Sequence, residues 1–150
     1  MGLENKRIVI GITSSFYAIE KAIPQIKKLI EEGADIIPIM SFNCYNLDFK
    51  GFTKQIEEIT GRKIIHTIED AEPIGHKFET DIMAIIPCTG NTIGKLANGI
   101  IDTSVLVAAK TNLKRRKQYC NWYCYKWWSF YWSWKHWKII KTEKYFFCTI

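Results

Sequence analysis

Small hydroxyl, amide and glycine residues follow three short apolar runs of the chain, at the points where each run ends. These three segments are residues 11–15, 41–43 and 87–92. Backbone N–H groups and hydroxyls in such segments can hold a phosphate at the positive end of a helix dipole. If the apolar runs are parallel strands, their carboxyl ends meet at one edge of a sheet, and the sequence then predicts a single anion-binding site there.

The first of these segments joins an apolar run directly to a helical pattern. Gly11, Thr13, Ser14 and Ser15 lie in it, but it is not a G-x-G-x-x-G fingerprint. No acidic residue closes the second apolar run, where a dinucleotide ribose would need one. A monophosphate such as that of FMN therefore suits it better than a dinucleotide. By themselves, the same residues favour the alternative of an ordinary Ser/Thr helix cap, and both interpretations stay open.

The third segment combines several groups suited to a ligand. Thr89 and Asn91 provide a hydroxyl and an amide, Gly90 allows close approach of the backbone, and Thr92 is expected to cap the next helix. Lys95 follows one turn later. A capped helix with a solvated lysine is the alternative interpretation. Two facing polar segments at strand ends are nevertheless typical of a ligand site.

The elements that must position these segments can be predicted from hydrophobic patterns. Apolar runs without alternation are typical of strands buried on both faces of a parallel sheet. Pro38 has no backbone N–H to donate to a neighbouring strand. Its strand is therefore predicted to lie at an edge of the sheet or to contain an irregularity at this residue. The expected strands are residues 8–12, 34–40 and 82–86, with residues 63–67 as a further short strand and residues 104–109 as a strand or the start of a helix.

Helical patterns separate these runs. Apolar residues recur every three or four positions from Ile19 to Ile30, and Gly33 supplies a stop. Residues 53–60 and 92–101 are predicted helices, whereas residues 41–51 are expected to form a loop and residues 68–77 mostly a connection. Alternating strands and helices predict an α/β fold, a Rossmann-like open parallel sheet with a helix layer on each face.

Composition limits the classes of function. The chain has 150 residues, 47% hydrophobic and 24% charged, which is typical of one globular domain. No apolar run reaches the roughly 18 residues that span a bilayer, and the start lacks the pattern of a signal peptide, so a cytoplasmic location is expected. The net charge of +6 divides into −2 over residues 1–113 (12 basic, 14 acidic) and +8 over residues 114–150 (9 basic, 1 acidic). Because residues 1–113 carry no excess of positive charge, they are not expected to bind nucleic acid or a membrane.

Cysteine and histidine residues do not predict a metal site. Cys44 and Cys88 are far apart in sequence and are expected to be free thiols in the cytoplasm. His66, His76 and His136 have no metal-ligand spacing between them.

The most specific motif is PCTGNTIGKLANGIID at residues 87–102. It resembles the flavin-binding segment P-A-S-A-N-T, followed by x-x-K-x-A-x-G-x-x-D, of the flavoprotein family that contains the FMN-dependent cysteine decarboxylases. The stretches KRIVIGITSS, IPQIKKLIEEGADIIPIMSFN, AEPIGHK and PCTGNTIGKLANGIIDTSVLVAAK are more similar to the B subunits of dipicolinate synthases. The resemblance covers residues 5–113.

This resemblance implies a three-layer αβα flavoprotein fold and an oxidoreductase-type enzyme. The B subunit would act with an A subunit that carries the nicotinamide-binding fold and NADPH. Together they would make dipicolinic acid from a dihydrodipicolinate-type product of the lysine pathway, in the mother cell during sporulation. A homo-oligomer is also expected. The alternatives are an FMN-dependent decarboxylase of the cysteine-processing kind and a non-enzymatic flavin-binding scaffold.

The resemblance also implies which residues hold FMN, whereas it assigns no catalytic residue. The phosphate loop would be Gly11, Thr13, Ser14 and Ser15; Ser41 and Phe42 would flank the flavin; and Thr89, Gly90, Asn91, Thr92 and Lys95 would surround its phosphate and ring. Two departures weaken the decarboxylase alternative. Position 90 is Gly where the decarboxylases have Ala, and their catalytic histidine has no convincing equivalent.

Residues 114–150 differ from residues 1–113 in amino-acid composition. All six Trp lie between Trp122 and Trp137, and residues 118–150 hold no Gly, no Pro and one acid. An aromatic and basic RNA-binding strip or an amphipathic membrane segment would be one interpretation. A shifted reading frame is simpler, because TGG codons read from the second base begin with GG and so encode Gly. A/T-rich codons then give EENNIVIGIATNGG and, further on, KNIFFVP, which are strand patterns.

We therefore interpret residues 1–113 as an incomplete flavoprotein-like domain and residues 114–150 as an aberrant tail. The chain would be truncated and inactive by itself, with its C-terminal strands lost. Sequencing of the gene across the codons for Lys114 to Gln118 is expected to find one base gained or lost in the A-rich run. An unbroken frame together with a soluble, well-folded product of this length would contradict the interpretation.

Overall fold

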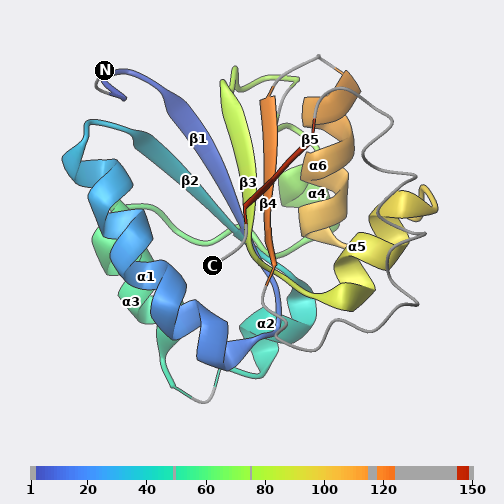
Figure 1. Ribbon diagram of the computed structural model, residues 1–150, viewed down its shortest axis with the longest axis horizontal. Helices are drawn as coiled ribbons and strands as arrows, with labels where there is room; N and C mark the ends of the chain where they lie inside the picture. The colour runs from blue at the N-terminus through green and yellow to red at the C-terminus, as the bar shows by residue number, and fades with distance from the viewer. Residues whose placement is uncertain (1–2, 49, 75, 115–117, 124–144, 149–150) are drawn as a thin grey trace.

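The computed structural model describes residues 3–48, 50–74, 76–114, 118–123 and 145–148. Within these residues five parallel strands form one sheet in the order β2-β1-β3-β4-β5 (Figure 1). The strands are β1 (Arg7–Ile12), β2 (Asp35–Met40), β3 (Ile82–Cys88), β4 (Gln118–Tyr123) and β5 (Tyr145–Cys148). The predicted α/β class and the three main predicted strands, which correspond to β1, β2 and β3, are confirmed.

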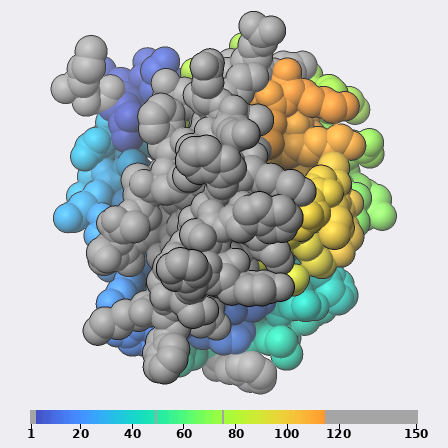
Figure 2. Space-filling view, turned by 45° about the vertical axis from the view of Figure 1, so that its right-hand side comes forward, coloured from blue at the N-terminus to red at the C-terminus, as the bar shows by residue number. Residues whose placement is uncertain are grey.

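Helices cover both faces of the sheet (Figure 1). One face carries α1 (Phe16–Glu31) and α3 (Phe52–Thr60), and the other carries α4 (Ile68–Ala71), α5 (Gly90–Ala97) and α6 (Ser104–Lys114). The short α2 (Phe42–Asn46) follows β2 at the carboxyl edge. In Figure 2, α5 (yellow) lies directly below α6 (orange) on one flank of the molecule. None of the helices in the described ranges is long and apolar enough to cross a membrane.

The side chains of β1 alternate between two hydrophobic cores. Ile8, Ile10 and Ile12 pack towards α1 and α3, whereas Val9 packs with the residues of α6. Gly11 lies on the α6 side, where a Cβ atom would come within 2.9 Å of Val105 Cγ1. The absence of a side chain at this position therefore lets α6 approach the sheet.

Pro38 occupies the predicted edge position, because β2 is the first strand of the sheet. The Pro38 carbonyl accepts from the Ile65 N–H at 3.1 Å, on the side of β2 away from β1. The nitrogen of a strand residue points to the same side as its carbonyl, so the missing N–H does not interrupt pairing with β1. Around Ile65, the predicted strand over residues 63–67 reduces to one isolated bridge with Ile39.

Of the two structures predicted for residues 104–109, the helix start is confirmed: they begin α6, because the Thr103 hydroxyl accepts from the Leu106 N–H and so caps a helix start. Other predicted local structures were wrong. The helix α5 spans Gly90–Ala97 rather than residues 92–101, and its cap is Thr89, not Thr92. Residues 41–51 and 68–77, expected as a loop and a connection, contain the short helices α2 and α4.

The C-terminal part of the sheet also differs from expectation, since no strand was predicted beyond residue 113. The backbone of residues 118–123 pairs in parallel with β3, from Ile82↔Gln118 to Cys88↔Tyr123, and β5 pairs with β4. The ladder is built from main-chain groups and accepts many side-chain sequences, so the open edge of β3 can be extended by this segment. Most of the tail, residues 124–144, lies outside the described residues, and the reading-frame interpretation stays a prediction.

The start of α3 depends on one carboxylate. Asp48 accepts from the backbone N–H groups of Phe52 at 2.8 Å and Thr53 at 2.7 Å. Burial tends to raise the pKa of this carboxyl, but hydrogen bonds from Thr53 and Phe52 outweigh burial and hold the pKa below its usual value. The ionised form is therefore the one that stabilises the fold.

We expect Asp48→Ala to lower the free energy of unfolding by about 1 kcal/mol at pH 7, because two helix donors lose their acceptor. The stabilisation is complete above the unfolded-state pKa of about 4 and is lost as the pH falls through the lower folded-state pKa. Urea denaturation of wild type and variant at pH 7 and below pH 3 checks both parts. Glu58→Ala, on the exposed side of α3, is the matched control. An equal difference at both pH values would disprove the assignment.

Candidate functional site

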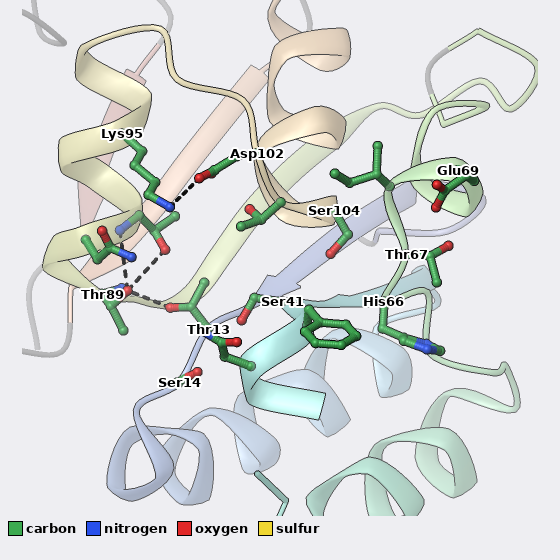
Figure 3. Close-up of a pocket in the computed structure, with 16 residues that line it drawn as sticks. Thr13, Ser14, Ser41, His66, Thr67, Glu69, Thr89, Lys95, Asp102 and Ser104 are labelled. Carbon is green, nitrogen blue, oxygen red and sulfur yellow. Dashed lines mark hydrogen bonds and ion pairs between the residues drawn. The ribbon is translucent and has the colours of Figure 1, made fainter. Parts of the chain in front are cut away.

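A buried hydroxyl joins the loops that follow β1 and β3. Thr13 donates to the Pro87 carbonyl from its backbone N–H at 3.2 Å and from its Oγ1 at 2.8 Å. The same Oγ1 accepts from the Thr89 N–H at 2.9 Å (Figure 3). Thr13 is 1% exposed, so these groups have no water to replace a lost partner. The first and third polar segments of the sequence are thus fixed side by side, as the parallel sheet predicts.

Two further bonds bring the end of β2 to the same place. The Ser41 N–H donates to the Ile12 carbonyl at 3.0 Å, which joins the ends of β2 and β1. The Ser104 hydroxyl donates to the Met40 carbonyl at 2.8 Å, and both groups are buried. The start of α6 is therefore attached directly to the end of β2.

These loops enclose a pocket of about 680 Å³ at the carboxyl edge of the sheet (Figure 3). Its volume lies in the range of cofactor and small-molecule sites. The residues that line it are mostly polar: Thr13, Ser14, Ser41, Phe42, Asn43, His66, Thr67, Ile68, Glu69, Thr89, Asn91, Thr92, Lys95, Asp102, Thr103 and Ser104.

The structure brings most of the residues selected from sequence to this pocket. Eight of the eleven line it: Thr13, Ser14, Ser41, Phe42, Thr89, Asn91, Thr92 and Lys95. Gly11 does not line it and instead makes room for Val105. Ser15 is the N-cap residue of α1, and Gly90 is the first residue of α5; neither lines the pocket. The binding of a cofactor by any of the eleven stays a prediction.

Sequence reasoning missed two groups of lining residues. His66, Thr67, Ile68 and Glu69 come from a segment interpreted as a strand and a connection. Asp102, Thr103 and Ser104 lie between α5 and the first turn of α6. A signal existed only for Asp102, which closes the motif at residues 87–102. The other residues reach the pocket through contacts that no local pattern reveals.

The electrostatics of the pocket favour an anion. The helices α1, α5 and α6 all begin at this edge (Figure 1), and the N–H groups of a first helical turn have no partner within the helix. Lys95 Nζ lies 2.6 Å from Asp102 Oδ2, and the lysine side chain is 26% exposed. The Thr89 and Thr92 hydroxyls lie 3.0 Å apart and add further polar groups. The arrangement can hold phosphate or carboxylate groups.

The described thiols are not suited to act as nucleophiles here. Cys44 and Cys88 are free and buried, which confirms the prediction from sequence. Burial, together with the nearby Asp48 charge, raises the pKa of Cys44 to about 12 despite a hydrogen bond with Ser14. Burial likewise raises the pKa of Cys88. Both stay protonated near neutral pH, and the described ranges contain no group of three or more potential metal ligands.

We expect Thr13→Val to lower the free energy of unfolding by about 1–3 kcal/mol, because the Thr89 N–H loses its acceptor in a buried place. Guanidinium denaturation followed by circular dichroism measures the change. Thr111→Val is the matched control: this threonine is 5% exposed, and its hydroxyl bonds only to the Val107 carbonyl of its own helix. If both substitutions lowered the free energy of unfolding equally, the bonds that Thr13 makes between the two loops would add no stability beyond that of a hydroxyl bonded within its own helix.

Comparisons with known proteins show sequence and fold similarity to subunits of one enzyme. The chain is 39% identical over 120 residues to the B subunit of dipicolinate synthase from Bacillus subtilis (strain 168), an alignment that covers 77% of this chain. It covers 60% of that relative, so the chain spans about three fifths of the relative's length. The crystal structure of the corresponding B subunit from Bacillus halodurans superposes with a TM-score of 0.88 and 28% identity, over 98% of this chain and 78% of the other.

A more distant structure shares the fold alone. The FMN-dependent cysteine decarboxylase SpaF superposes with a TM-score of 0.72 and 19% identity, over 99% of this chain and 86% of the other. The sequence profile of the family described as Flavoprotein matches residues 2–121, which is most of the chain. With that match, and with a polar pocket at the carboxyl edge of an open parallel sheet, the chain belongs to the Flavoprotein family.

Proposed function

We propose that the chain is the B subunit of a dipicolinate synthase and that it holds FMN in the carboxyl-edge pocket. The observation that carries the proposal is the similarity to the B subunits of two dipicolinate synthases, one by sequence and one by structure. Together with an A subunit that binds the nicotinamide cofactor, it would oxidise or dehydrate a cyclic dihydrodipicolinate-type precursor from the lysine pathway. In the oxidation, the electrons removed from the precursor would reduce the oxidised nicotinamide to NADPH. The product is dipicolinic acid, made in the mother-cell cytoplasm of a spore former.

The residues of the pocket fit FMN. Ser14 and the N–H groups at the start of α1 would hold the phosphate, and Asn91 at the start of α5 would contact the phosphate or the ring edge. Ser41 and Phe42 would flank the flavin ring, since both line the pocket and Phe42 presents an aromatic side chain that is 58% exposed. When bound, FMN would supply reversible electron transfer.

The other pocket groups would orient the flavin and its substrate. Thr13 keeps the two phosphate loops together through Pro87 and Thr89. Lys95 lies beside Asp102, where it would contribute positive charge to the side of α5 that faces the ligand. The hydroxyls of Thr89 and Thr92 would offer further hydrogen bonds.

Partners are implied by the names of the relatives, which are subunits of a larger enzyme. We propose a separate A subunit as the carrier of the nicotinamide cofactor, together with self-association of the present chain into a homo-oligomer. Tyr17 at the start of α1 is 69% exposed, and Phe42 at the start of α2 is also exposed. A partner that packs on Phe42 would also exclude water from the pocket, because Phe42 lines it.

A decarboxylase of the cysteine-processing kind is the second candidate, favoured by the structural likeness to SpaF. Gly90 and the absence of an equivalent catalytic histidine in the sequence argue against it. A flavin-binding scaffold without activity is the third. The three candidate functions can be distinguished by deleting the gene. Only the dipicolinate synthase subunit predicts that the deletion strain lacks dipicolinate.

Deletion of the gene in its spore-forming host is expected to abolish spore dipicolinate, and added dipicolinate is expected to rescue the spores. Spore dipicolinate measured by terbium fluorescence checks both. A frame-corrected gene, supplied in trans, tests whether the tail matters for activity. Unchanged dipicolinate in the deletion strain would eliminate the proposed function, whatever the protein binds.

The flavin part is checked separately with the purified protein. FMN fluorescence is expected to be quenched on binding, and Asn91→Leu is expected to weaken FMN about tenfold or more, because a buried hydrogen-bonding partner is left unsatisfied. Asn98→Leu, at the far end of α5, is the matched control, since its amide bonds to the Gly94 carbonyl. Absence of any FMN binding would remove the cofactor from the proposal.

A further inference from the structure

Lys95 and Asp102 form an ion pair within the lining of the carboxyl-edge pocket. Lys95 extends from α5 toward Asp102, and its Nζ lies 2.6 Å from Asp102 Oδ2 (Figure 3). None of the other ion pairs in the described ranges has both partners in this lining. The proposed function uses the charge of the lysine and gives no role to the carboxylate beside it.

The main chain places Asp102 independently of the ion pair. The helix α5 ends with Gly99 in the left-handed conformation, at φ +71°. The Gly99 and Ile100 N–H groups donate to carbonyls in the last turn of α5 at 3.2 Å and 2.9 Å, which is the Schellman arrangement. Directly after Asp102, Thr103 caps α6. The carboxylate therefore has a fixed place between two helices.

This carboxylate sets the direction of a flexible side chain. A lysine stem samples many rotamers when nothing holds its ammonium group. Among the residues that the structure describes, Asp102 is the hydrogen-bond acceptor of the Lys95 ammonium. An ammonium has three donors, so the remaining N–H groups of Lys95 can bind an anionic group of a ligand.

The charges of the lining restrict how such an anion can bind. Among the lining residues that the structure describes, Lys95 is the single lysine or arginine, whereas Glu69 and Asp102 both carry carboxylates. A phosphate monoester brings about two further negative charges near pH 7. Attraction exceeds repulsion where the ammonium stands between the phosphate and the carboxylate of Asp102, because the opposite charges are then the closer ones.

The phosphate of FMN is the anionic group that this ammonium would meet. Asn91 and Lys95 are four residues apart on α5, so their side chains share one face of the helix, and both line the pocket. Figure 3 shows Lys95 on the same side of the pocket as Thr13, Ser14 and Thr89, which belong to the loops assigned to the phosphate.

We propose that Asp102 is a positioning residue that holds the Lys95 ammonium toward the phosphate of FMN. This rests on the proposed function and deepens it, because it explains how a lining with more carboxylates than ammonium groups binds a phosphate. Asp102 acts through Lys95 and makes no contact of its own with the flavin. Its role requires the acceptor oxygen and does not require the negative charge.

The test compares the affinities of the full chain for FMN and for riboflavin, which lacks the phosphate, by quenching of flavin fluorescence. Asp102→Ala removes the acceptor and is expected to weaken FMN about tenfold while riboflavin affinity stays unchanged. Asp102→Asn retains an acceptor oxygen and is expected to bind FMN at least as tightly as the wild type. A carboxylate that only repelled the phosphate would instead make both variants bind FMN more tightly.

Lys95→Met tests whether Asp102 acts through the lysine. It is expected to weaken FMN about as much as Asp102→Ala, again with riboflavin affinity unchanged. The double variant is expected to show no additional loss, since the two residues act as one unit. Glu20→Ala is the matched control, because it breaks a lysine–carboxylate pair with Lys50 that lies outside the lining, and its FMN affinity is expected to equal that of the wild type.

Unchanged FMN affinity in Lys95→Met, or equal losses of FMN and riboflavin affinity in Asp102→Ala, overturns the inference while the FMN assignment stands. If Asp102→Ala does not fold, the other two single variants decide. FMN affinity retained in Asp102→Asn and lost in Lys95→Met supports the inference, and any other pair of results overturns it. If the wild type binds no FMN, the cofactor part of the proposed function fails, and the inference fails with it.

Discussion

The Thr13 hydroxyl makes the contact on which the carboxyl edge of this protein depends. It donates to the Pro87 carbonyl and accepts from the Thr89 N–H, so one side chain satisfies main-chain groups of two loops. The loops come from β1 and β3, which are neighbours in the sheet although 74 residues separate Thr13 from Pro87. Because Thr13 is buried, the loops cannot separate without leaving polar groups unpaired. The start of α5, with its cap Thr89, is placed by the same bonds.

Packing on the two faces of the sheet completes the site. The missing Cβ of Gly11 admits Val105, so α6 lies close to β1, and Ser104 at its start reaches the Met40 carbonyl at the end of β2. The helix α6 therefore packs in the hydrophobic core and at the same time places its N-terminus at the pocket. Core and site are built by the same residues, and a substitution at Gly11 would disturb both.

The chemistry available at this edge is binding and orientation rather than covalent attack. The buried thiols stay protonated, and the lining supplies hydroxyls, amides, helix N-termini, one imidazole, one lysine and two carboxylates. The hydroxyls, amides and helix N-termini can hold and orient an anion. A bound flavin and a partner subunit would then supply the electron transfer, which agrees with the position of the relatives as subunits of a synthase.

The amino-acid sequence by itself determined the α/β class, the strands β1, β2 and β3 and the polar loops at their ends. Strand burial, helix periodicity and the glycine and threonine residues of turns are local signals. Tertiary structure alone decided the rest of the lining. His66 arrives through the bridge between Ile39 and Ile65, and Ser104 through its bond to the Met40 carbonyl. The extension of the sheet by residues 118–123 was likewise invisible in the side-chain pattern. It is made by main-chain hydrogen bonds to a neighbouring strand, and such bonds depend on which segments the fold brings together.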